Sequence, residues 1–185
     1  MLQNLYLICG KSGSGKTYTV NKLHDEYGYN VLCSYTTRKP RLKYDTDHYY
    51  VDISKYYEDL SNKMIATDSC YEKNLYWSTF EQVKNSDLYV IDKTGIEKLK
   101  ERYSERQLVV IYLDTTKNTR ISRMHFSRGD STKKINKRIK YDESNSFKGI
   151  EHLADFIVNG DSNEQWETVH NIIEKCEEVD LHGIN

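Results

Sequence analysis

A glycine-rich segment near the start of the chain has the residue types and spacing of a phosphate-binding loop. The stretch GKSGSGKT (10–17) fits the pattern G-x-x-x-x-G-K-S/T at every position. Its glycines allow backbone torsions that turn successive N–H groups inward, which makes a nest for anions. Lys16 supplies a positive charge for the β- and γ-phosphates of a nucleotide, and the Thr17 hydroxyl is placed for Mg²⁺. The loop therefore predicts a bound nucleotide, held by Gly10, Lys11, Ser12, Gly13, Ser14, Gly15, Lys16 and Thr17.

A second group of anion-binding residues surrounds the only proline of the chain. Arg38 and Arg41 flank Pro40 in the stretch SYTTRKPR (34–41). Guanidinium groups bind phosphate through two parallel hydrogen bonds and keep their charge. Because this stretch follows a predicted strand, it should open at the same edge of the sheet as the phosphate loop. Two phosphate sites that face each other predict a donor and an acceptor of a phosphoryl group.

Apolar runs and helical repeats alternate along the rest of the chain, which predicts an α/β fold with a parallel sheet flanked by helices. Segment 35–80 interrupts this alternation with short strands and many tyrosines, so we expect it to form an inserted lobe. The predicted strands are 5–10, 30–34, 48–52, 87–92, 107–114 and 155–159. The predicted helices are 16–27, 54–62, 94–103, 116–126, 132–147 and 162–178.

Composition limits the class of protein. The 185 residues are enough for one domain, and 27 Lys+Arg against 28 Asp+Glu gives no reason to expect a nucleic-acid partner. No apolar run approaches the length of a membrane span, and no signal peptide is recognisable. The cysteines lack metal-type spacing, and Cys9 and Cys33 lie in apolar runs as reduced core residues would. We therefore expect a cytoplasmic protein with small-molecule partners, either a monomer or a homodimer.

These segments together resemble the guanylate kinase family. The stretch SYTTRKPR is similar to the family's nucleotide-loop signature S-x-T-T-R-x-P-R at each fixed position. Four further stretches resemble family motifs in the same order along the chain: YWST (76–79), IDKTG (91–95), SRGDSTKKINKRI (127–139) and FIVNG (156–160). The resemblance covers nearly the whole chain. It implies one phosphate-loop kinase domain with a core (1–34, 81–126 and 148–185), an acceptor-binding lobe (35–80) and a lid (127–147).

The resemblance also implies a reaction. ATP would be the phosphoryl donor, with Mg²⁺, and a nucleoside monophosphate, GMP or dGMP, would be the acceptor. Asn159 would lie against the adenine of ATP, while Arg128 and Arg138 would close from the lid onto the transferring group. Since charge in such a transfer lies on peripheral oxygens, catalysis depends on alignment and on cations. The residues expected to act in catalysis are Lys16, Arg38, Arg128 and Arg138.

The implied acceptor contacts fall into two groups. Arg38, Arg41 and Tyr76 would hold the phosphate of the acceptor. Ser34 and Ser78 would hydrogen-bond its base, with Asp92 nearby. With the positions discussed next, the expected acceptor-binding residues are Ser34, Arg38, Arg41, His48, Tyr50, Thr67, Asp68, Tyr76, Ser78 and Asp92.

The chain departs from the family pattern in the acceptor lobe. The family's guanine-reading glutamate lies nine residues before the tyrosine of YWST, where this chain has Thr67 followed by Asp68. The phosphate-contacting tyrosine corresponds either to Tyr50 or to His48, which point to the same face of a predicted strand. Trp77 replaces a family glycine, and it either narrows the acceptor pocket, stacks on a base or belongs to the core. Because that glutamate is missing, we expect weaker selectivity for guanine than in family members that carry it.

Two other functions remain open from the sequence. One is a related kinase that acts on a different (deoxy)nucleotide or on a small phosphorylated molecule. The other is a non-catalytic guanylate-kinase-like module that binds proteins. The complete phosphate loop and the arginines of the loop and lid favour an enzyme, because a binding module has no need of them.

Overall fold

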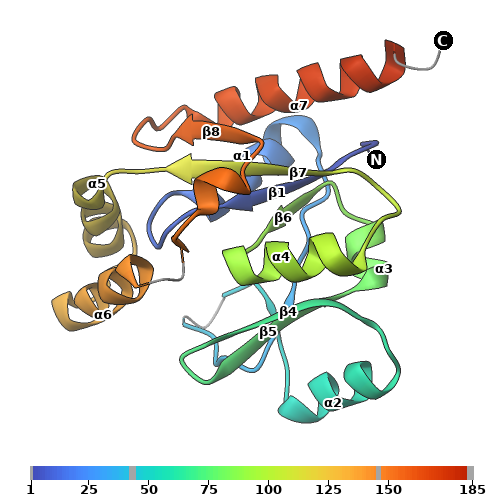
Figure 1. Cartoon of the computed structure of the whole chain (residues 1–185). Helices are drawn as coiled ribbons and strands as arrows, with labels where there is room; N and C mark the ends of the chain where they lie inside the picture. Colours follow the sequence, from blue (N-terminus) through green and yellow to red (C-terminus); the bar gives the residue numbers. More distant parts are fainter. Residues whose placement is uncertain (1, 42–44, 145–146, 183–185) are drawn as a thin grey trace.

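Two β-sheets form the framework of the structure, a computed structural model that describes residues 2–41, 45–144 and 147–182 (Figure 1). The core strands are β1 (Leu5–Cys9), β6 (Leu88–Val90), β7 (Leu108–Asp114) and β8 (Phe156–Asn159). Within the described residues they have the order β6-β1-β7-β8, and each pair of neighbours is parallel. The predicted α/β fold with a parallel sheet is confirmed.

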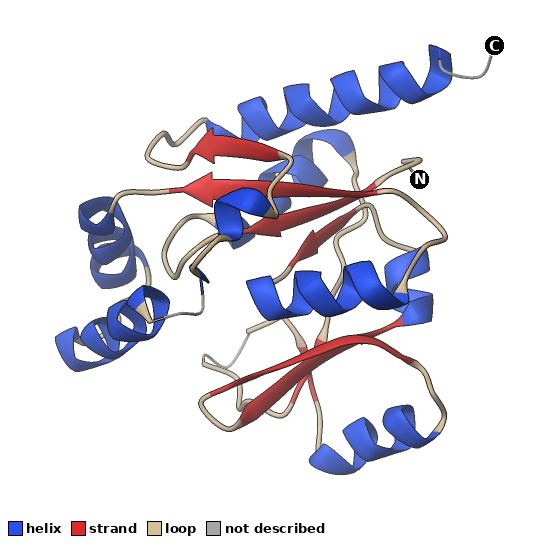
Figure 2. Cartoon of the chain, in the orientation of Figure 1, coloured by secondary structure: helices blue, strands red, loops and turns tan. Residues whose placement is uncertain are grey.

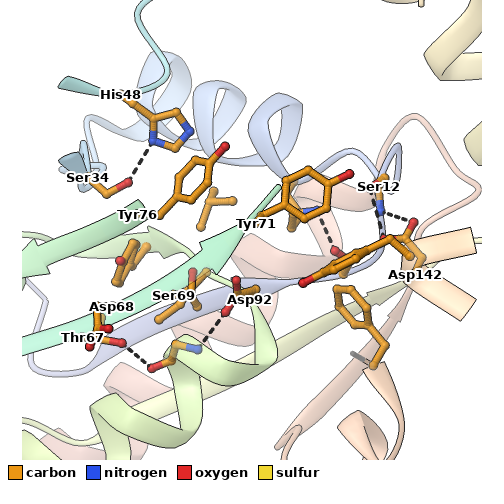
Figure 3. A pocket seen from close by; sticks show the side chains of 18 of the residues that line it. Ser12, Ser34, His48, Thr67, Asp68, Ser69, Tyr71, Tyr76, Asp92 and Asp142 are labelled. Atoms are coloured by element: carbon orange, nitrogen blue, oxygen red, sulfur yellow. Dashed lines mark hydrogen bonds between the residues drawn. The ribbon is translucent and has the colours of Figure 1, made fainter. Parts of the chain in front are cut away.

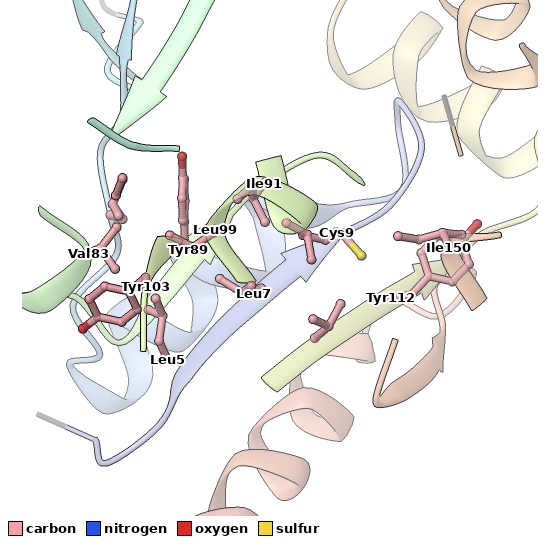
Figure 4. Close-up of a cluster of buried hydrophobic side chains, with 14 of the residues drawn as sticks. Leu5, Leu7, Cys9, Val83, Tyr89, Ile91, Leu99, Tyr103, Tyr112 and Ile150 are labelled. Atoms are coloured by element: carbon pink, nitrogen blue, oxygen red, sulfur yellow. The ribbon is translucent and has the colours of Figure 1, made fainter. Parts of the chain in front are cut away.

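The central strand β1 is buried on both faces, which explains its unbroken apolar sequence. Leu5, Leu7 and Cys9 point to one apolar cluster, which Figure 4 shows, and Tyr6 and Ile8 point to the other. All five side chains are fully buried. Because neighbouring residues of a strand point to opposite faces, only a sheet covered on both sides needs apolar residues at every position.

Helices cover both faces of the core sheet (Figure 2). One face packs against α1 (Lys16–Tyr27) and α7 (Gln165–His182), and the other packs against α4 (Lys93–Arg102). No helix among the described residues is both long and apolar enough to cross a membrane.

The segment predicted as a strand at 30–34 is not one, and this expectation is wrong. Only Val31 forms an isolated bridge, to Leu88 at the edge of the sheet. The Leu32 N–H donates to the Leu88 carbonyl, after which the chain turns away toward the second sheet. Cys33 is consequently only partly buried, whereas the sequence predicted a core residue.

The second sheet is formed by short strands between residues 35 and 79 and lies beside the core. Its strands have the order β3-β2-β5-β4, with β4 and β5 paired as an antiparallel hairpin. Glu72 and Lys73 form the tight turn of this hairpin, both with positive φ. The elements of this lobe are β2 (Tyr35–Thr36), β3 (Tyr49–Tyr50), α2 (Ile53–Ser61), β4 (Ile65–Tyr71) and β5 (Asn74–Thr79). It is followed by the short helix α3 (Phe80–Lys84).

Trp77 belongs to the core of this lobe, which resolves the three possibilities left by the sequence. Its side chain is fully buried, and its indole N–H donates to the carboxylate of Asp59 at 2.9 Å. Asp59 is itself fully buried and also accepts from Lys55 Nζ at 2.8 Å. The helix α2 is therefore fixed to the sheet through a charged hydrogen bond.

A third group of helices follows β7 and contains the predicted lid. α5 (Lys117–Ser122) continues into a π-helical turn, η1 (Arg123–Ser127), and α6 (Thr132–Glu143) packs against both. Ile135 and Ile139 of α6 contact Met124 in a small apolar cluster. The helix predicted at 132–147 thus ends at residue 143.

Replacing Trp77 by Phe should destabilise the protein by about 1.5–3 kcal/mol, because it removes a buried hydrogen bond to a charged group. Urea unfolding at equilibrium would measure the loss. Trp166→Phe is the matched control, since Trp166 is only partly buried beside α1. Equal effects of the two substitutions would contradict the importance of the Asp59 contact.

Candidate active site

The loop between β1 and α1 has the backbone geometry of an anion nest. Gly13 and Gly15 both have positive φ, at 81° and 97°. A Cβ at Gly13 would lie 2.7 Å from the Arg120 carbonyl oxygen, so no larger residue fits there. Gly15 immediately precedes α1, whose free N-terminal N–H groups favour a bound anion.

Lys16 lies across this loop. Its Nζ donates to the carbonyl oxygens of Gly10, at 2.6 Å, and Lys11, at 3.2 Å. Burial, and then the nearby Arg128 guanidinium, lower the pKa of Lys16 to about 8. A bound phosphate would replace these carbonyl contacts and restore the stability of the charged form.

Four cationic side chains surround one cavity beside the phosphate loop. Lys16, Arg41, Arg128 and Arg138 all line this space of about 330 Å³. Removal from water lowers the pKa values of Arg41 and Arg128, and neighbouring arginines lower them further. Both of these side chains still reach solvent, so the crowding of like charge is the more informative cause. The cavity thus has the charge of a site for a strongly anionic ligand.

Arg38 and Tyr50 are held in a separate hydrogen-bonded network. Arg38 Nη1 donates to Asp45 Oδ2 at 3.2 Å, and its Nη2 donates to the Tyr50 hydroxyl at 3.1 Å. Burial acts to raise the pKa of Asp45, but hydrogen bonds from Tyr50 and from the Arg41 N–H hold this pKa below its usual range. Asp45 therefore occupies the place beside Arg38 that was expected for the acceptor's phosphate.

A second cavity, of about 220 Å³, adjoins the cationic one (Figure 3). The two cavities share Ser12, Lys16, Ser34, Arg41, His48, Val90 and Arg138. The sheet of the lobe, the end of β6 and the lid helix α6 all contribute to its wall. The expected acceptor residues that line it are Ser34, Arg41, His48, Thr67, Asp68, Tyr76 and Asp92.

His48 and Ser34 form a hydrogen-bonded pair in this second cavity. The Ser34 hydroxyl lies 2.9 Å from His48 Nδ1. Burial, and then the charge of Arg38, lower the pKa of His48 to about 4, so the imidazole is neutral near pH 7. Tyr76 packs edge-on against the same ring. Of the two candidates from the sequence, His48 lines the cavity and Tyr50 contacts Arg38.

The two residues at the guanine-reading position are already engaged. The Thr67 hydroxyl donates to the Gly95 carbonyl at 2.8 Å. Asp68 accepts from Lys98 Nζ at 2.8 Å and from Arg102 Nη1 at 3.1 Å, so its charge is compensated. Ser78 is fully buried and pairs in register with Thr67.

Asp92 lies at the bottom of the same cavity, just beyond the end of β6. Its Oδ1 accepts from the Gly95 N–H at 2.7 Å, which caps the N-terminus of α4. Figure 3 shows its carboxylate on the cavity side, near Ser69. It thereby provides this part of the cavity with a carboxylate whose position is fixed.

A third cavity lies on the other side of the phosphate loop. Asn159, expected against the adenine of ATP, does not line this cavity, and its side-chain oxygen accepts from the Asp161 N–H at 3.0 Å. Arg123, which the sequence did not single out, lines the cavity and donates to the Gly160 carbonyl at 2.7 Å. Asn163 lines it as well. No motif marks Arg123 or Asn163, because each lies in a segment that reads as an ordinary polar helix or turn.

The lobe and the lid meet at the rim of the second cavity. The rings of Tyr71 and Tyr141 lie edge to face with centroids 4.5 Å apart. Glu72 and Lys137 form an ion pair at 3.0 Å. The cavity is thus enclosed by the core, the lobe and the lid together.

Comparison with known proteins gives a consistent result. A family model described as guanylate kinase matches residues 2–176. A guanylate kinase of Fusobacterium nucleatum is 24% identical over 181 residues, covering 92% of this chain and 95% of that protein. A guanylate kinase of Legionella pneumophila is 27% identical over 172 residues, covering 85% of this chain and 79% of that one.

Solved structures show a similar fold. The crystal structure of guanylate kinase from Anaplasma phagocytophilum superposes with a TM-score of 0.68. The alignment covers 96% of this chain and 89% of that one, at 23% sequence identity.

The lowered pKa of Lys16 predicts a pH dependence of nucleotide binding. Below about pH 8 the lysine is charged; as the pH rises through that value the unliganded loop loses the charge and affinity falls. Titration calorimetry with ATP from about pH 7.5 to 9.5 should therefore show weakening affinity. The other titratable or charged groups that act on the pKa of Lys16 are Cys9, Arg120, Arg128 and Asp142.

Lys16→Arg is the control for this measurement, because a guanidinium stays charged over the whole range. Its ATP affinity should change little with pH. A wild-type affinity that is constant over the same range would contradict the assignment.

Proposed function

The chain belongs to the guanylate kinase family, and on that premise we propose that it transfers the γ-phosphoryl group of ATP to GMP or dGMP. The products are ADP and GDP or dGDP. The observation that carries this proposal is the cationic cavity between the phosphate loop and the second cavity. A nucleotide-hydrolysing switch has no need of a second phosphate site at that position.

The reaction requires alignment more than acid–base catalysis. An oxygen of the acceptor's phosphate attacks the γ-phosphorus, and the bond from that phosphorus to the ADP oxygen breaks. The acceptor phosphate is largely ionised at neutral pH, since the second pKa of a phosphate monoester is about 6. No general base is therefore needed, and the protein's task is to bring two anions together.

Each cation of the cavity would bind a different part of the two anions. Arg41 lines the second cavity and would hold the acceptor's phosphate by donating two parallel hydrogen bonds from its guanidinium. Arg128 and Arg138, from the lid, would offset the charge on the transferring oxygens. Lys16 would leave its two carbonyl partners for the β- and γ-phosphates.

Thr17 fits a role in binding Mg²⁺. It is in the first turn of α1 and lines the cavities on both sides of the loop. The described residues contain no cluster of three or more His, Cys, Asp or Glu side chains able to hold a metal. Such a setting suits Mg²⁺ that takes most of its ligands from phosphates and water. When bound, the ion would neutralise charge on the β- and γ-phosphates.

Arg38 would join the acceptor site by exchanging partners. Its guanidinium is held by Asp45 and Tyr50 close to Arg41. A bound phosphate, like the Asp45 carboxylate, offers oxygens that accept from a guanidinium, and it carries more charge. We therefore assign Arg38 to the acceptor's phosphate after this exchange, and Tyr50 with it.

The base of the acceptor would lie between the lobe and α4. Asp92 provides a carboxylate that can accept from the ring N–H and amino group of guanine, and the Ser34–His48 pair provides neutral partners. Asp68, whose charge is offset by Lys98 and Arg102, is less suited to this role.

The reduced cysteines and the nucleotide substrates support a cytoplasmic location, and we propose a monomer or homodimer.

The test is an assay of product formation. Purified protein with ATP and Mg²⁺ should convert GMP and dGMP to the diphosphates faster than AMP, CMP or UMP. Lys16→Ala should abolish turnover while the protein remains folded, because the side chain supports no part of the apolar core. Product formation with none of these acceptors would refute the proposal, and preference for another base would redefine the acceptor.

The two loop arginines should differ in their kinetics. Arg41→Lys should raise the KM for GMP by about ten-fold or more, because one charged hydrogen bond of about 1.5–3 kcal/mol is lost. The KM for ATP should stay nearly unchanged. Arg38→Lys should also lower kcat if its contact strengthens in the transition state.

Steady-state kinetics with each substrate varied at saturating partner would measure both effects. Lys39→Ala, an exposed neighbour in the same loop, is the control. If the arginine substitutions changed only the KM for ATP and left the KM for GMP unchanged, the arginine loop would belong to the donor site.

A further inference from the structure

One residue of the phosphate loop, Ser12, has all three of its polar groups bonded to α5 or to the lid helix α6. The Ser12 N–H donates to Asp142 Oδ2 at 2.9 Å, and the Ser12 hydroxyl donates to Asp142 Oδ1 at 3.2 Å. The Ser12 carbonyl accepts from Arg120 Nη1 at 3.3 Å. We refer to Ser12, Arg120 and Asp142 as the Ser12 bracket.

The ion pair of the bracket is buried and electrically balanced, whereas Ser12 is partly buried. Arg120 Nη1 also donates to Asp142 Oδ2 at 2.9 Å, and the two side chains are 3% and 2% exposed. Because the guanidinium offsets the carboxylate, Asp142 can lie beside a phosphate site without strongly repelling its ligand. Buried ion pairs of this kind contribute little to stability, since desolvation cancels most of their attraction. Stability alone therefore does not explain why the pair is here.

The position of Asp142 on α6 connects the bracket to the reaction. Arg138 precedes Asp142 by four residues, so both side chains lie on one face of the helix. Both also line the second cavity, together with Ser12. Elsewhere on the same helix, Ile135 and Ile139 pack against Met124. Whatever fixes Asp142 to the loop consequently fixes the direction of Arg138.

We propose that Asp142 is a positioning residue, which through Ser12 and Arg120 holds the lid helix in place on the phosphate loop so that Arg138 lies over the transferring phosphoryl group. The inference rests on the proposed function for its catalytic consequence. It predicts that the bracket contributes to kcat more than to the stability of the fold.

The test replaces the buried pair by apolar side chains of similar size, Arg120→Met with Asp142→Leu. No lone buried charge is left, so the melting temperature should be retained or raised. Without the bracket, Arg138 is oriented less firmly, by its 4.0 Å contact with Asp130. We therefore expect kcat to fall by about ten-fold or more, because small misplacements of catalytic groups have effects of this size. The KM for GMP should change much less than kcat.

The control is Glu143→Ala. Glu143 follows Asp142 directly and pairs with Lys117 of α5 at 2.7 Å, but both side chains are exposed. The substitution therefore removes an ion pair between α5 and α6 but leaves the contacts with the phosphate loop unchanged. Its kcat should stay within about two-fold of the wild type.

A second readout does not need activity. Hydrogen exchange of the ligand-free protein should become faster at the amides of Ser12 and α6 in the double variant, and should not change in Glu143→Ala. If the wild-type protein phosphorylates no monophosphate, the proposed function fails, while this exchange experiment still decides whether the bracket holds the lid. Should the double variant not fold, Arg120→Gln with Asp142→Ala takes its place in both measurements, since it likewise leaves no lone buried charge.

Three outcomes would overturn the proposal. One is a stable double variant with wild-type kcat. Another is unchanged hydrogen exchange at Ser12 and α6. The third is a loss of kcat in Glu143→Ala as large as in the double variant, since any contact between α5 and α6 would then serve.

Discussion

The repulsion among four cations in one cavity is the constraint on which the rest of this structure depends. Lys16, Arg41, Arg128 and Arg138 come from the phosphate loop, the arginine loop and the lid, and no single element could hold them together. Two of them have partners outside the cavity: Lys16 donates to loop carbonyls, and Arg138 lies 4.0 Å from Asp130. The energy that keeps them close is supplied by the buried sheet and by the contacts between lobe and lid. An anionic ligand removes the repulsion.

Much of the fold follows from local sequence, because the features that decide it are local. The unbroken apolar run of β1 predicts a strand covered on both faces, and the glycines after it predict the loop. The strand expected at 30–34 shows the limit of this reasoning. Its residues have the right composition, but only one position pairs with the sheet before the chain leaves for the lobe. Where a chain changes sheets depends on distant partners that no local pattern records.

The residues of the site also fall into those that the sequence predicts and those that it does not. The phosphate loop and the arginines were recognisable because their chemistry is carried by neighbouring residues. The contacts of Asp45 and Asp142 were not, since an aspartate in a polar loop or helix reads as a solvated residue until its partner is known. Ser12 and Asp142 are 130 positions apart in the chain. The engagement of Thr67 by Gly95 was hidden for the same reason.

The turn between β4 and β5 has a consequence for how this chain can vary. Glu72 and Lys73 both adopt positive φ, a conformation that costs non-glycine residues about 1 kcal/mol or more each. Substitution by glycine would relieve that cost, yet Glu72 is the residue that meets Lys137 of the lid. The number of residues in this turn therefore sets how far the lobe reaches toward the lid. Homologous chains that lengthen or shorten the hairpin would need a compensating change in the length of the lid helix, so the two segments should vary in length together.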